Sequence, residues 1–402
     1  MKSAYRFRAY PSEEQKAILN YQMLLSKELY NHILEKSQQH FKDTSKPFTK
    51  YDMNKWITKF KKEHPEYNDI YSQVLQNVPD RVSKAYKNFF RRVKEKRNGK
   101  KQQVGFPRFK HFVSSLTYPQ SGFKIEKKRI NVSRIGNINF VNHREIEGDI
   151  KTLSIKKTKS QEWFITVSVE KEDKPFISNN KPQIGLDLGL KEYATLSDNI
   201  KIANMRFGKE YEYKLIKSHR LVSRRIKGSR SRKKAVILLS KVYDKVTNKR
   251  EDFAHKLSHN LVNSYSFIAY EDLQIQNMVK NHKLAKSIND VSWARFTQFL
   301  RYKAESAGCR VVDVPPQYTT QTCHECGNIQ EMPLERRIFN CDKCSLQIDR
   351  DLNAAKNILR LGLEKSLTTS GQGGSYASGD IVRLPHMGAD VAESGTRFGV
   401  LI

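Results

Sequence analysis

The chain has 402 residues, of which 38% are hydrophobic, and its 73 Lys and Arg exceed its 42 Asp and Glu by a formal net charge of +31. The basic residues run through the whole chain, which favours a large polyanionic partner, and nucleic acid above all. No apolar run approaches the roughly 18 residues of a spanning helix and the N-terminus lacks a signal-peptide core, so we expect no membrane contact and a cytoplasmic protein.

The first pattern along the chain is a strand followed by a helix. Residues 1–10 alternate apolar and charged side chains, which predicts a strand with one charged face. Ser12 and Gln15 have the spacing of a capping box, which predicts a helix start. Apolar residues at helical spacing then continue to Ile33, so the strand leads directly into a long helix.

A second helical pattern over about 74–93 has an apolar stripe, assigned to the core, and a basic opposite face. Pro79 within it predicts a kink or a fresh helix start after Asn77. The joint at 91–110 carries nine Lys or Arg against Glu95 alone, interleaved with aromatic rings, which suits stacking on bases and pairing with phosphates. A solvated basic linker is the alternative. The candidate nucleic-acid contacts here are Arg91, Arg92, Lys94, Arg108 and Lys110.

From about 117 to 172 the pattern changes to strands. It is clearest at 163–169, where alternate residues are apolar. Together with the first strand, these segments predict a small β-barrel into which the helices of residues 11–100 are inserted.

Three carboxylates stand out in the next region. Asp187 lies in a hydrophobic strand at 183–190, where an acid is costly unless it is paired, and a metal ion would pair it. Taken alone, it could equally be a structural or turn carboxylate. A later strand at 266–270 ends in Glu271, and the helix after the last cysteine pair opens with Asp351. Carboxylates at the ends of separate elements of one α/β unit are what phosphodiester chemistry with two Mg²⁺ roughly 4 Å apart requires.

The most basic segment, 214–250, has fourteen Lys or Arg against Asp244 alone and predicts one or two long helices with an exposed cationic face beside the carboxylates. A solvated face without a partner is the alternative. A further amphipathic helix over 291–300, with Trp293 in the core, leads to a strand at 310–314. The candidate nucleic-acid contacts here are Arg224, Arg225, Arg230, Arg232 and Lys233.

Four cysteines form two CxxC pairs. Cys323 and Cys326 are followed after fourteen residues by Cys341 and Cys344, a spacing that predicts one tetrahedral Zn²⁺. Four thiolates leave no open position, so this zinc is structural and takes no part in catalysis. Four unrelated cysteines or two disulfides are the alternative, which no visible oxidising context supports. Cys309 belongs to the core.

These motifs together resemble those of TnpB, a family of transposon-encoded RNA-guided nucleases related to the ancestors of type V CRISPR effectors. The resemblance extends from the N-terminus to about residue 363. Its most specific motifs are Gly185-Leu-Asp-Leu-Gly-Leu190, Glu271-Asp-Leu273, Tyr318-Thr-Thr-Gln-Thr-Cys323-His-Glu-Cys326-Gly327, Cys341-Asp-Lys-Cys344 and Asp349-Arg-Asp-Leu-Asn-Ala-Ala-Lys-Asn357.

The resemblance implies an α/β fold plus a β-barrel: a RuvC-like RNase H fold with a zinc-ribbon insert, preceded by an oligonucleotide-binding (wedge) barrel with an inserted helical recognition domain. It assigns the catalytic triad to Asp187, Glu271 and Asp351. Asp351 is preferred to Asp349 because the family's aspartate sits two residues before the Asn-Ala-Ala run. The expected domains are the first barrel strand at 1–10, the recognition domain at 11–104, the rest of the barrel at 105–180, the nuclease at 181–317 and 349–363, the target-nucleic-acid-binding zinc ribbon at 318–348, and a disordered Gly/Ser-rich tail at 364–402.

The function implied is RNA-guided cleavage of DNA by a protein encoded in a transposable element. Pairing to a guide RNA would supply most of the sequence specificity, and the protein would read a short motif beside the target DNA. Two Mg²⁺ would be the catalytic cofactors and one Zn²⁺ the structural one. Two other functions stay open: a nuclease-inactive, RNA-guided repressor and a guide-independent DNA-binding protein that assists transposition. The oligomeric state, guide, adjacent motif and cleavage pattern do not follow from the sequence.

Overall fold

The computed structural model describes residues 2–100, 103–172, 180–333 and 335–370. These residues divide into two compact units, one before residue 174 and one after it. Within them, no helix combines the length and the apolar character needed to cross a membrane.

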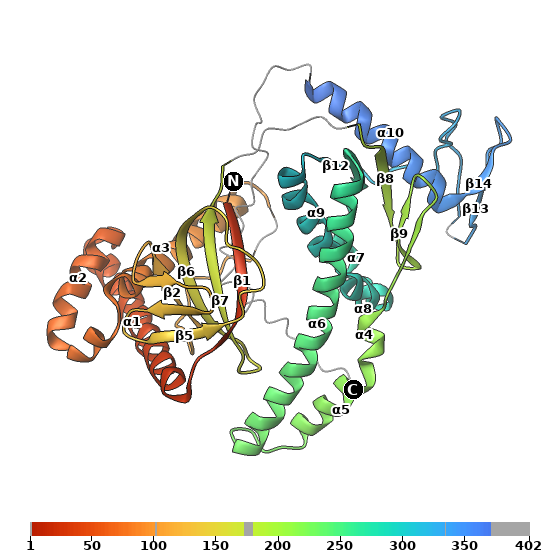
Figure 1. Cartoon of the computed structure of the whole chain (residues 1–402). Coiled ribbons are helices and arrows are strands. Elements are labelled where there is room, and N and C mark those ends of the chain that lie inside the picture. The colour runs from red at the N-terminus through yellow and green to blue at the C-terminus, as the bar shows by residue number, and fades with distance from the viewer. Residues whose placement is uncertain (1, 101–102, 173–179, 334, 371–402) are drawn as a thin grey trace. The chain divides into compact units, whose positions relative to one another are not determined.

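The first unit contains a seven-stranded antiparallel sheet (Figure 1). Its strand order is β2-β6-β7-β1-β5-β4-β3, so β1 lies in the middle and β2 and β3 end the hydrogen-bonded order. The predicted strands at 1–10 and 163–169 are confirmed, whereas closure into a barrel stays a prediction. The strands are β1 (Lys2–Tyr10), β2 (Ser115–Pro119), β3 (Phe123–Ile125), β4 (Arg129–Val132), β5 (Gly136–Phe140), β6 (Asp149–Lys157) and β7 (Trp163–Glu170).

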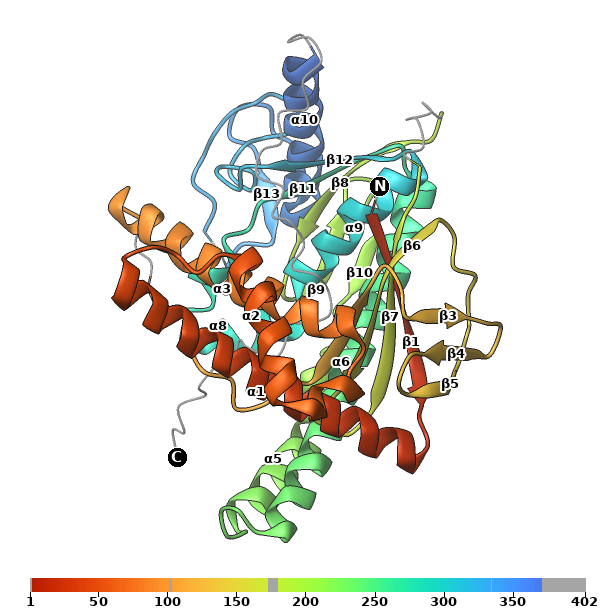
Figure 2. The same ribbon diagram turned by 90° about the vertical axis from the view of Figure 1, so that its left-hand side faces the viewer.

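Three helices join β1 to β2 and share one apolar core with the sheet (Figure 2). The predicted capping box is confirmed, because the Ser12 hydroxyl accepts the Gln15 N–H at 3.2 Å and the Gln15 side chain accepts the Ser12 N–H at 3.0 Å. The helices are α1 (Glu13–Thr44), α2 (Lys50–Glu63) and α3 (Ser72–Arg97), with a 3-10 turn at Pro65–Asp69.

The sequence predicted a kink or a fresh helix start after Asn77. The fresh start is wrong, because α3 runs without a break through Pro79, whereas a kink there stays a prediction. Proline inside a helix costs about 3 kcal/mol through its lost hydrogen bond and its clash with the preceding turn. Leu75, Val78 and Val82, however, are each at most 3% exposed on the same helix. Burying such side chains is worth about 1.5–3 kcal/mol each, so packing outweighs the proline.

The second unit is built on a five-stranded mixed sheet in the order β10-β9-β8-β11-β12, whose strands are labelled in Figure 2. β8 pairs antiparallel with β9 and parallel with β11, which in turn pairs parallel with β12. The predicted strand around Asp187, its returning partner and the two later strands are confirmed. The strands are β8 (Gln183–Leu188), β9 (Glu192–Leu196), β10 (Lys201–Ala203), β11 (Phe267–Glu271) and β12 (Arg310–Val314).

Helices cover both faces of this sheet. Ile268 and Tyr270 of β11 share a core with α6 and α9, whereas Phe267 and Ala269 pack with Ile358 of α10, as the two-residue period of a strand requires. Trp293 and Cys309 are buried, as predicted. The helices are α4 (Phe207–Glu210), α5 (Glu212–Ser223), α6 (Arg230–Ser264), α7 (Ile275–Met278), α8 (His282–Val291), α9 (Trp293–Ala307) and α10 (Arg350–Ser370).

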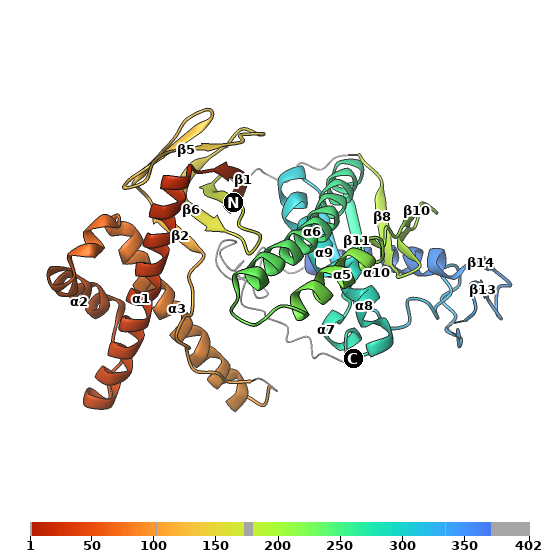
Figure 3. The ribbon, with the colours of Figure 1, turned by 90° about the horizontal axis from the view of Figure 1, so that it is seen from below.

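Three of these helices confirm or correct predictions from the basic and C-terminal segments. The long helices predicted in 214–250 are α5 and α6, which pack against each other as a helical hairpin (Figure 3). α10 continues to Ser370, past the predicted limit of 363. The remainder of the predicted tail, 371–402, lies outside the described residues.

The backbone of α10 lies directly on the sheet at two glycines. A Cβ atom on Gly185 of β8 would lie 2.1 Å from the carbonyl oxygen of Ala355, and one on Gly362 would lie 2.5 Å from Cβ of Ala269. Helix and strand approach this closely only where no side chain intervenes. Ala355 contacts Gly185 on β8 and Gly362 contacts Ala269 on β11, and these two strand residues are partners in register, so α10 crosses from β8 to β11. Its first turn, which contains Asp351, lies near Asp187 toward the carboxyl end of β8.

We expect Gly185→Ala to destabilise the protein by about 1–3 kcal/mol, because the added methyl meets backbone atoms of α10 that cannot move aside without lifting the helix. Urea unfolding of the full chain measures the effect. The matched control is Gly105→Ala, where nothing lies within 4 Å of the added carbon. Equal unfolding midpoints for the two variants would contradict the close approach.

Candidate functional site

Three carboxylates from separate elements meet at the carboxyl edge of the second sheet. Leu186 and Tyr270 are partners in the parallel register of β8 and β11, so the residues that follow them, Asp187 and Glu271, are neighbours on the face that α10 covers. Asp351 lies in the first turn of α10, over the same edge. The structure therefore brings together the three residues that the sequence predicted as a triad.

The negative charges at this edge act on one another. Burial, followed by the charges of Glu271 and Asp351, raises the pKa of Asp187 well above its ordinary value, and nearby Arg350 offsets this only in part. Burial also raises the pKa of Glu271, against a hydrogen bond from Thr319. A partly buried cluster of acids favours a bound cation, and an all-oxygen donor set is the type that Mg²⁺ prefers.

Two of the carboxylates are open to a polyanion. Asp187 and Asp351 line a hollow of about 270 Å³, whereas Glu271 is only 8% exposed and is not among the residues that line it. Lys191 and Arg337 line the same hollow, and the Arg337 guanidinium lies 4.0 Å from the Asp351 carboxylate. Acidic ligands for a cation and basic groups for phosphate therefore share one opening.

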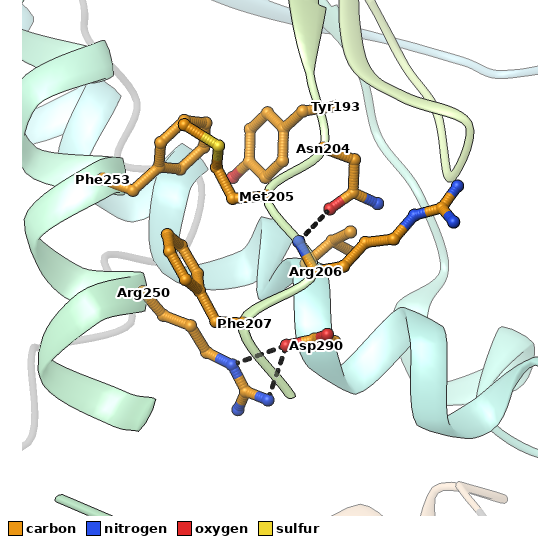
Figure 4. A pocket seen from close by; sticks show the side chains of 9 residues that line it. Tyr193, Asn204, Met205, Arg206, Phe207, Arg250, Phe253 and Asp290 are labelled. Carbon is orange, nitrogen blue, oxygen red and sulfur yellow. Dashed lines mark hydrogen bonds and ion pairs between the residues drawn. The ribbon is translucent and has the colours of Figure 1, made fainter. Parts of the chain in front are cut away.

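A second cavity, between β9, α6 and α8, has a different character (Figure 4). Its volume is about 10 Å³, room for about one water molecule. Asp290, the carboxylate in its lining, accepts the Gly208 N–H at 2.8 Å and two Arg250 N–H groups at 2.7 and 2.9 Å. These bonds engage the Asp290 carboxylate, and those from Arg250 tie α8 to α6. The cavity is therefore no candidate for catalysis.

Asp349 and Asp351 have different surroundings, although only one residue separates them. The Asp349 Oδ1 accepts the N–H groups of Asp351 at 2.9 Å and Leu352 at 3.2 Å, which caps α10, and its Oδ2 pairs with Lys201 at 2.7 Å. Both oxygens of Asp349 are therefore engaged in structure. This is a physical reason to keep Asp351, which lines the hollow, in the candidate site.

The two cysteine pairs form knuckles of one design. In each, the first cysteine N–H bonds a carbonyl five residues on, and the residue after the second cysteine bonds back to the carbonyl of the first. That residue, Gly327 or Ser345, has a positive φ in both knuckles. The second knuckle lies between β13 (Ile338–Asn340) and β14 (Gln347–Asp349), which pair as a short hairpin, and β14 leads directly into α10.

The four thiol sulfurs fit a single zinc ion. They lie within 4.8 Å of one another, with Cys323 to Cys344 and Cys326 to Cys341 both at 3.6 Å. A tetrahedral Zn²⁺ with bonds of about 2.3 Å places its sulfurs about 3.8 Å apart, whereas a disulfide requires about 2.05 Å. Among the described residues, this is the only group of three or more His, Cys, Asp or Glu with ligand atoms clustered in this way.

The basic residues predicted in the first unit divide into two kinds. Arg91, Lys94 and Arg108 are exposed. The Arg92 guanidinium donates to the Gly105 carbonyl at 3.1 Å, and the Lys110 ammonium lies 5.2 Å from the centre of the Tyr30 ring. The first kind is available to a polyanion, whereas the second also stabilises the joint itself.

The basic residues predicted in the second unit lie at the turn of the α5–α6 hairpin. The Arg232 guanidinium donates to the carbonyls of Val222 at 2.7 Å and Arg225 at 3.1 Å, which closes the turn. The other four side chains are exposed: Arg224, Arg225, Arg230 and Lys233.

Comparison with known proteins covers both units. A family model described as a Cas12f1-like TNB domain matches residues 293–358, one described as a probable transposase of the IS605 OrfB type matches 165–282, and a helix-turn-helix model of the same type matches 1–46. In this structure, the last range holds the strand β1 and the single helix α1.

Two relatives match over nearly their full length. A putative RNA-guided DNA endonuclease of Streptomyces pristinaespiralis is 29% identical over 381 residues, 92% of each chain. The putative RNA-guided DNA endonuclease InsQ of Escherichia coli K12 is 28% identical over 381 residues, 89% of this chain and 92% of its own. The chain thus carries segments of the IS605 OrfB transposase type and is similar along most of its length to proteins named putative RNA-guided DNA endonucleases.

A solved structure of the mini-RNA-guided endonuclease CRISPR-Cas_phi3 aligns over 90% of this chain and 92% of its own, with a TM-score of 0.49 and 11% identity. The fold described here is defined by the strand orders and cores of the two units and not by this partial similarity.

The sequence did not reveal the roles of several residues at or near the candidate site. Thr319 bonds Glu271, Asn353 and Asn357 are wholly buried on α10, and Arg337 lines the hollow. The spacing of the two asparagines, four residues apart, places them on one helix face and could have indicated a shared role. Arg337 and Thr319 carried no comparable signal.

The two aspartates at the start of α10 should respond differently to substitution. Asp349→Ala removes the helix cap and should cost about 1 kcal/mol of unfolding free energy, whereas Asp351→Ala should cost little, since its carboxylate bonds no helix N–H. Urea unfolding without added Mg²⁺ measures both. A larger loss for Asp351→Ala than for Asp349→Ala would be incompatible with this assignment.

Metal analysis of the purified protein should find about one zinc per chain. Cys341→Ser should remove a ligand and loosen residues 318–348, because metal binding supplies much of the folding free energy of such a small ribbon. Limited proteolysis reports the loosening, with Cys309→Ser, outside the cluster, as the control. A zinc-free ribbon that resists protease would refute the site.

Proposed function

We propose that this chain is an RNA-guided DNA endonuclease encoded by a transposable element, and that it cuts target DNA beside a short adjacent motif by metal-dependent phosphodiester hydrolysis with two Mg²⁺. The observation that carries the proposal is the meeting of Asp187, Glu271 and Asp351 at one sheet edge beside a hollow that also holds basic groups. The resemblance of the motifs to TnpB, the matching IS605 OrfB transposase models and the names of the two long relatives support the RNA-guided part.

Each group at the edge has a distinct role in this proposal. Asp187, between the other two acids, would bridge the cations, Glu271 would hold a cation on the side of the attacking water, and Asp351 would complete the donor set. Bound Mg²⁺ would supply water activation and stabilisation of the leaving oxygen. Lys191 and Arg337 would hold the phosphate backbone in the hollow.

The zinc ribbon would be structural and would contact target nucleic acid. The exposed cations of both units would hold the guide RNA and the DNA by their backbones, with sequence read mainly by base pairing. We assign the sheet of the first unit to the wedge barrel and α1–α3 to the recognition helices, with the domain limits predicted from the sequence except that the last nuclease helix reaches Ser370. A nucleoid-associated location in the cytoplasm would follow from this function.

The decisive experiment is cleavage of double-stranded DNA by protein purified with its flanking transcript. With Mg²⁺ and a matching RNA, the protein should cut a target that bears the correct adjacent motif. Mismatches close to that motif should reduce cutting more than distal ones, because pairing nucleates there. Binding alone decides nothing, since a protein with a net charge of +31 binds any nucleic acid at low salt.

Asp187→Ala is the matched control, because it removes a metal ligand while leaving the cationic surfaces intact. It should abolish cutting and preserve RNA-directed DNA binding. Cutting that proceeds equally without RNA would indicate an unguided nuclease. Tight guided binding by the wild type without any cutting would instead favour a repressor.

A further inference from the structure

The Glu271 carboxylate has a hydrogen-bond donor that belongs to neither the predicted triad nor the zinc ligands. The Thr319 hydroxyl donates to Glu271 Oε1 at 2.5 Å. Thr319 is 2% exposed and Glu271 is 8% exposed, so water competes little for either partner. A hydrogen bond from a hydroxyl to a charged carboxylate is stronger than one between two neutral groups, and it fixes the plane of the carboxylate.

The Thr319 hydroxyl has a second possible acceptor, so the acceptor to which it donates indicates its role. The Pro316 carbonyl lies 3.3 Å from Thr319 Oγ1, at the long end of hydrogen-bond distances. A threonine hydroxyl has one proton, and the shorter contact to the charged acceptor takes it. If the Thr319 hydroxyl served only to stabilise its own turn, a hydrogen bond to the Pro316 carbonyl would have been enough.

The turn that presents Thr319 is held from α10. The Asn357 amide donates to the carbonyls of Thr319 at 3.0 Å and Thr322 at 2.6 Å. Tyr318, just before Thr319, has a positive φ of 62°, which turns the chain out of the preceding proline pair. The hydroxyl is therefore preorganised by its backbone before any cation binds.

The same helix holds the first zinc knuckle. Asn353 accepts the His324 N–H at 3.0 Å and donates to the Thr322 carbonyl at 2.7 Å. Cys323 lies between these two anchored residues. Because Asp351 begins the helix that carries both asparagines, Asp351, the knuckle and the Thr319 turn form one hydrogen-bonded assembly.

We propose that Thr319 is a positioning residue that holds Glu271 Oε1 so that the carboxylate is presented to a divalent cation in a fixed orientation. The inference rests on the proposed function, because it assumes that Glu271 is a cation ligand. Donors that orient metal ligands are worth about 10–100-fold in metal affinity. Thr319 would contribute in this way without touching the cation or the DNA.

The test is the affinity of the full chain for Mn²⁺, which is measured from the electron paramagnetic resonance signal of the free ion. Thr319→Val keeps the shape of the side chain and removes the hydroxyl, and should weaken Mn²⁺ binding by about 10–100-fold. Thr319→Ser keeps the hydroxyl and should retain most of the affinity. The control is Thr297→Val, since the Thr297 hydroxyl bonds only the Ala294 carbonyl on α9 and should leave binding unchanged.

Zinc content and urea unfolding of each variant separate positioning from folding. If Thr319→Val loses zinc or folded structure, Thr319→Ala replaces it, because it removes the hydroxyl without adding an apolar contact. Folded Thr319→Val with wild-type Mn²⁺ affinity would overturn the inference. Failure of both substitutions to fold, with Thr319→Ser folded, would also overturn it, because the bond would then be structural.

Asp187→Ala keeps this outcome distinct from a failure of the proposed function. If the wild type binds Mn²⁺ and Asp187→Ala does not, the carboxylate edge is the cation site and the Thr319 variants alone decide the inference. If Asp187→Ala binds Mn²⁺ as tightly as the wild type, the proposed cation site itself is wrong.

Discussion

The direct contact between the backbone of α10 and the sheet is the constraint on which the rest of the second unit depends. Gly185 and Gly362 remove the side chains that would keep helix and strands apart. The helix therefore crosses the face of β8 and β11, and its first turn lies near Asp187 toward the carboxyl end of β8. Asp351 is brought to Asp187 and Glu271 by this packing, although the chain between Glu271 and Asp351 holds three helices, a strand and the zinc ribbon.

At the start of α10, the helix N–H groups need acceptors and the carboxylates of the site need nearby positive charge. The Asp349 carboxylate supplies acceptors for the first N–H groups, and the positive end of a helix dipole stabilises nearby acids. Asp351 thereby stays available at the hollow. Burial and the repulsion of the neighbouring carboxylates still raise the pKa of Asp187. A bound cation at this sheet edge would therefore compensate the negative charges. A strongly basic protein thus keeps one acidic site, where the proposed chemistry needs it.

The zinc ribbon is more than an appendage to this site. Its first knuckle is tied to α10 through Asn353, and the turn before it is tied through Asn357. Arg337, just before β13, reaches the Asp351 carboxylate. A zinc ion on the four cysteines would rigidify the backbone around it. The buried amides of Asn353 and Asn357 therefore join the cysteine cluster and the proposed catalytic edge in one hydrogen-bonded framework.

The sequence by itself determined the chemistry-bearing residues and most of the elements. The CxxC pairs are local, the strands around Asp187 and Glu271 follow from apolar runs, and capping at Ser12 depends on neighbours three residues away. Tertiary structure decided what depends on residues far apart. It kept α3 intact through Pro79 because the buried face outweighs the lost bond, and it engaged Asp349 in a cap and an ion pair with Lys201. It also brought the Thr319 hydroxyl to Glu271, 48 residues away, since such a contact exists only once the sheet and α10 have packed.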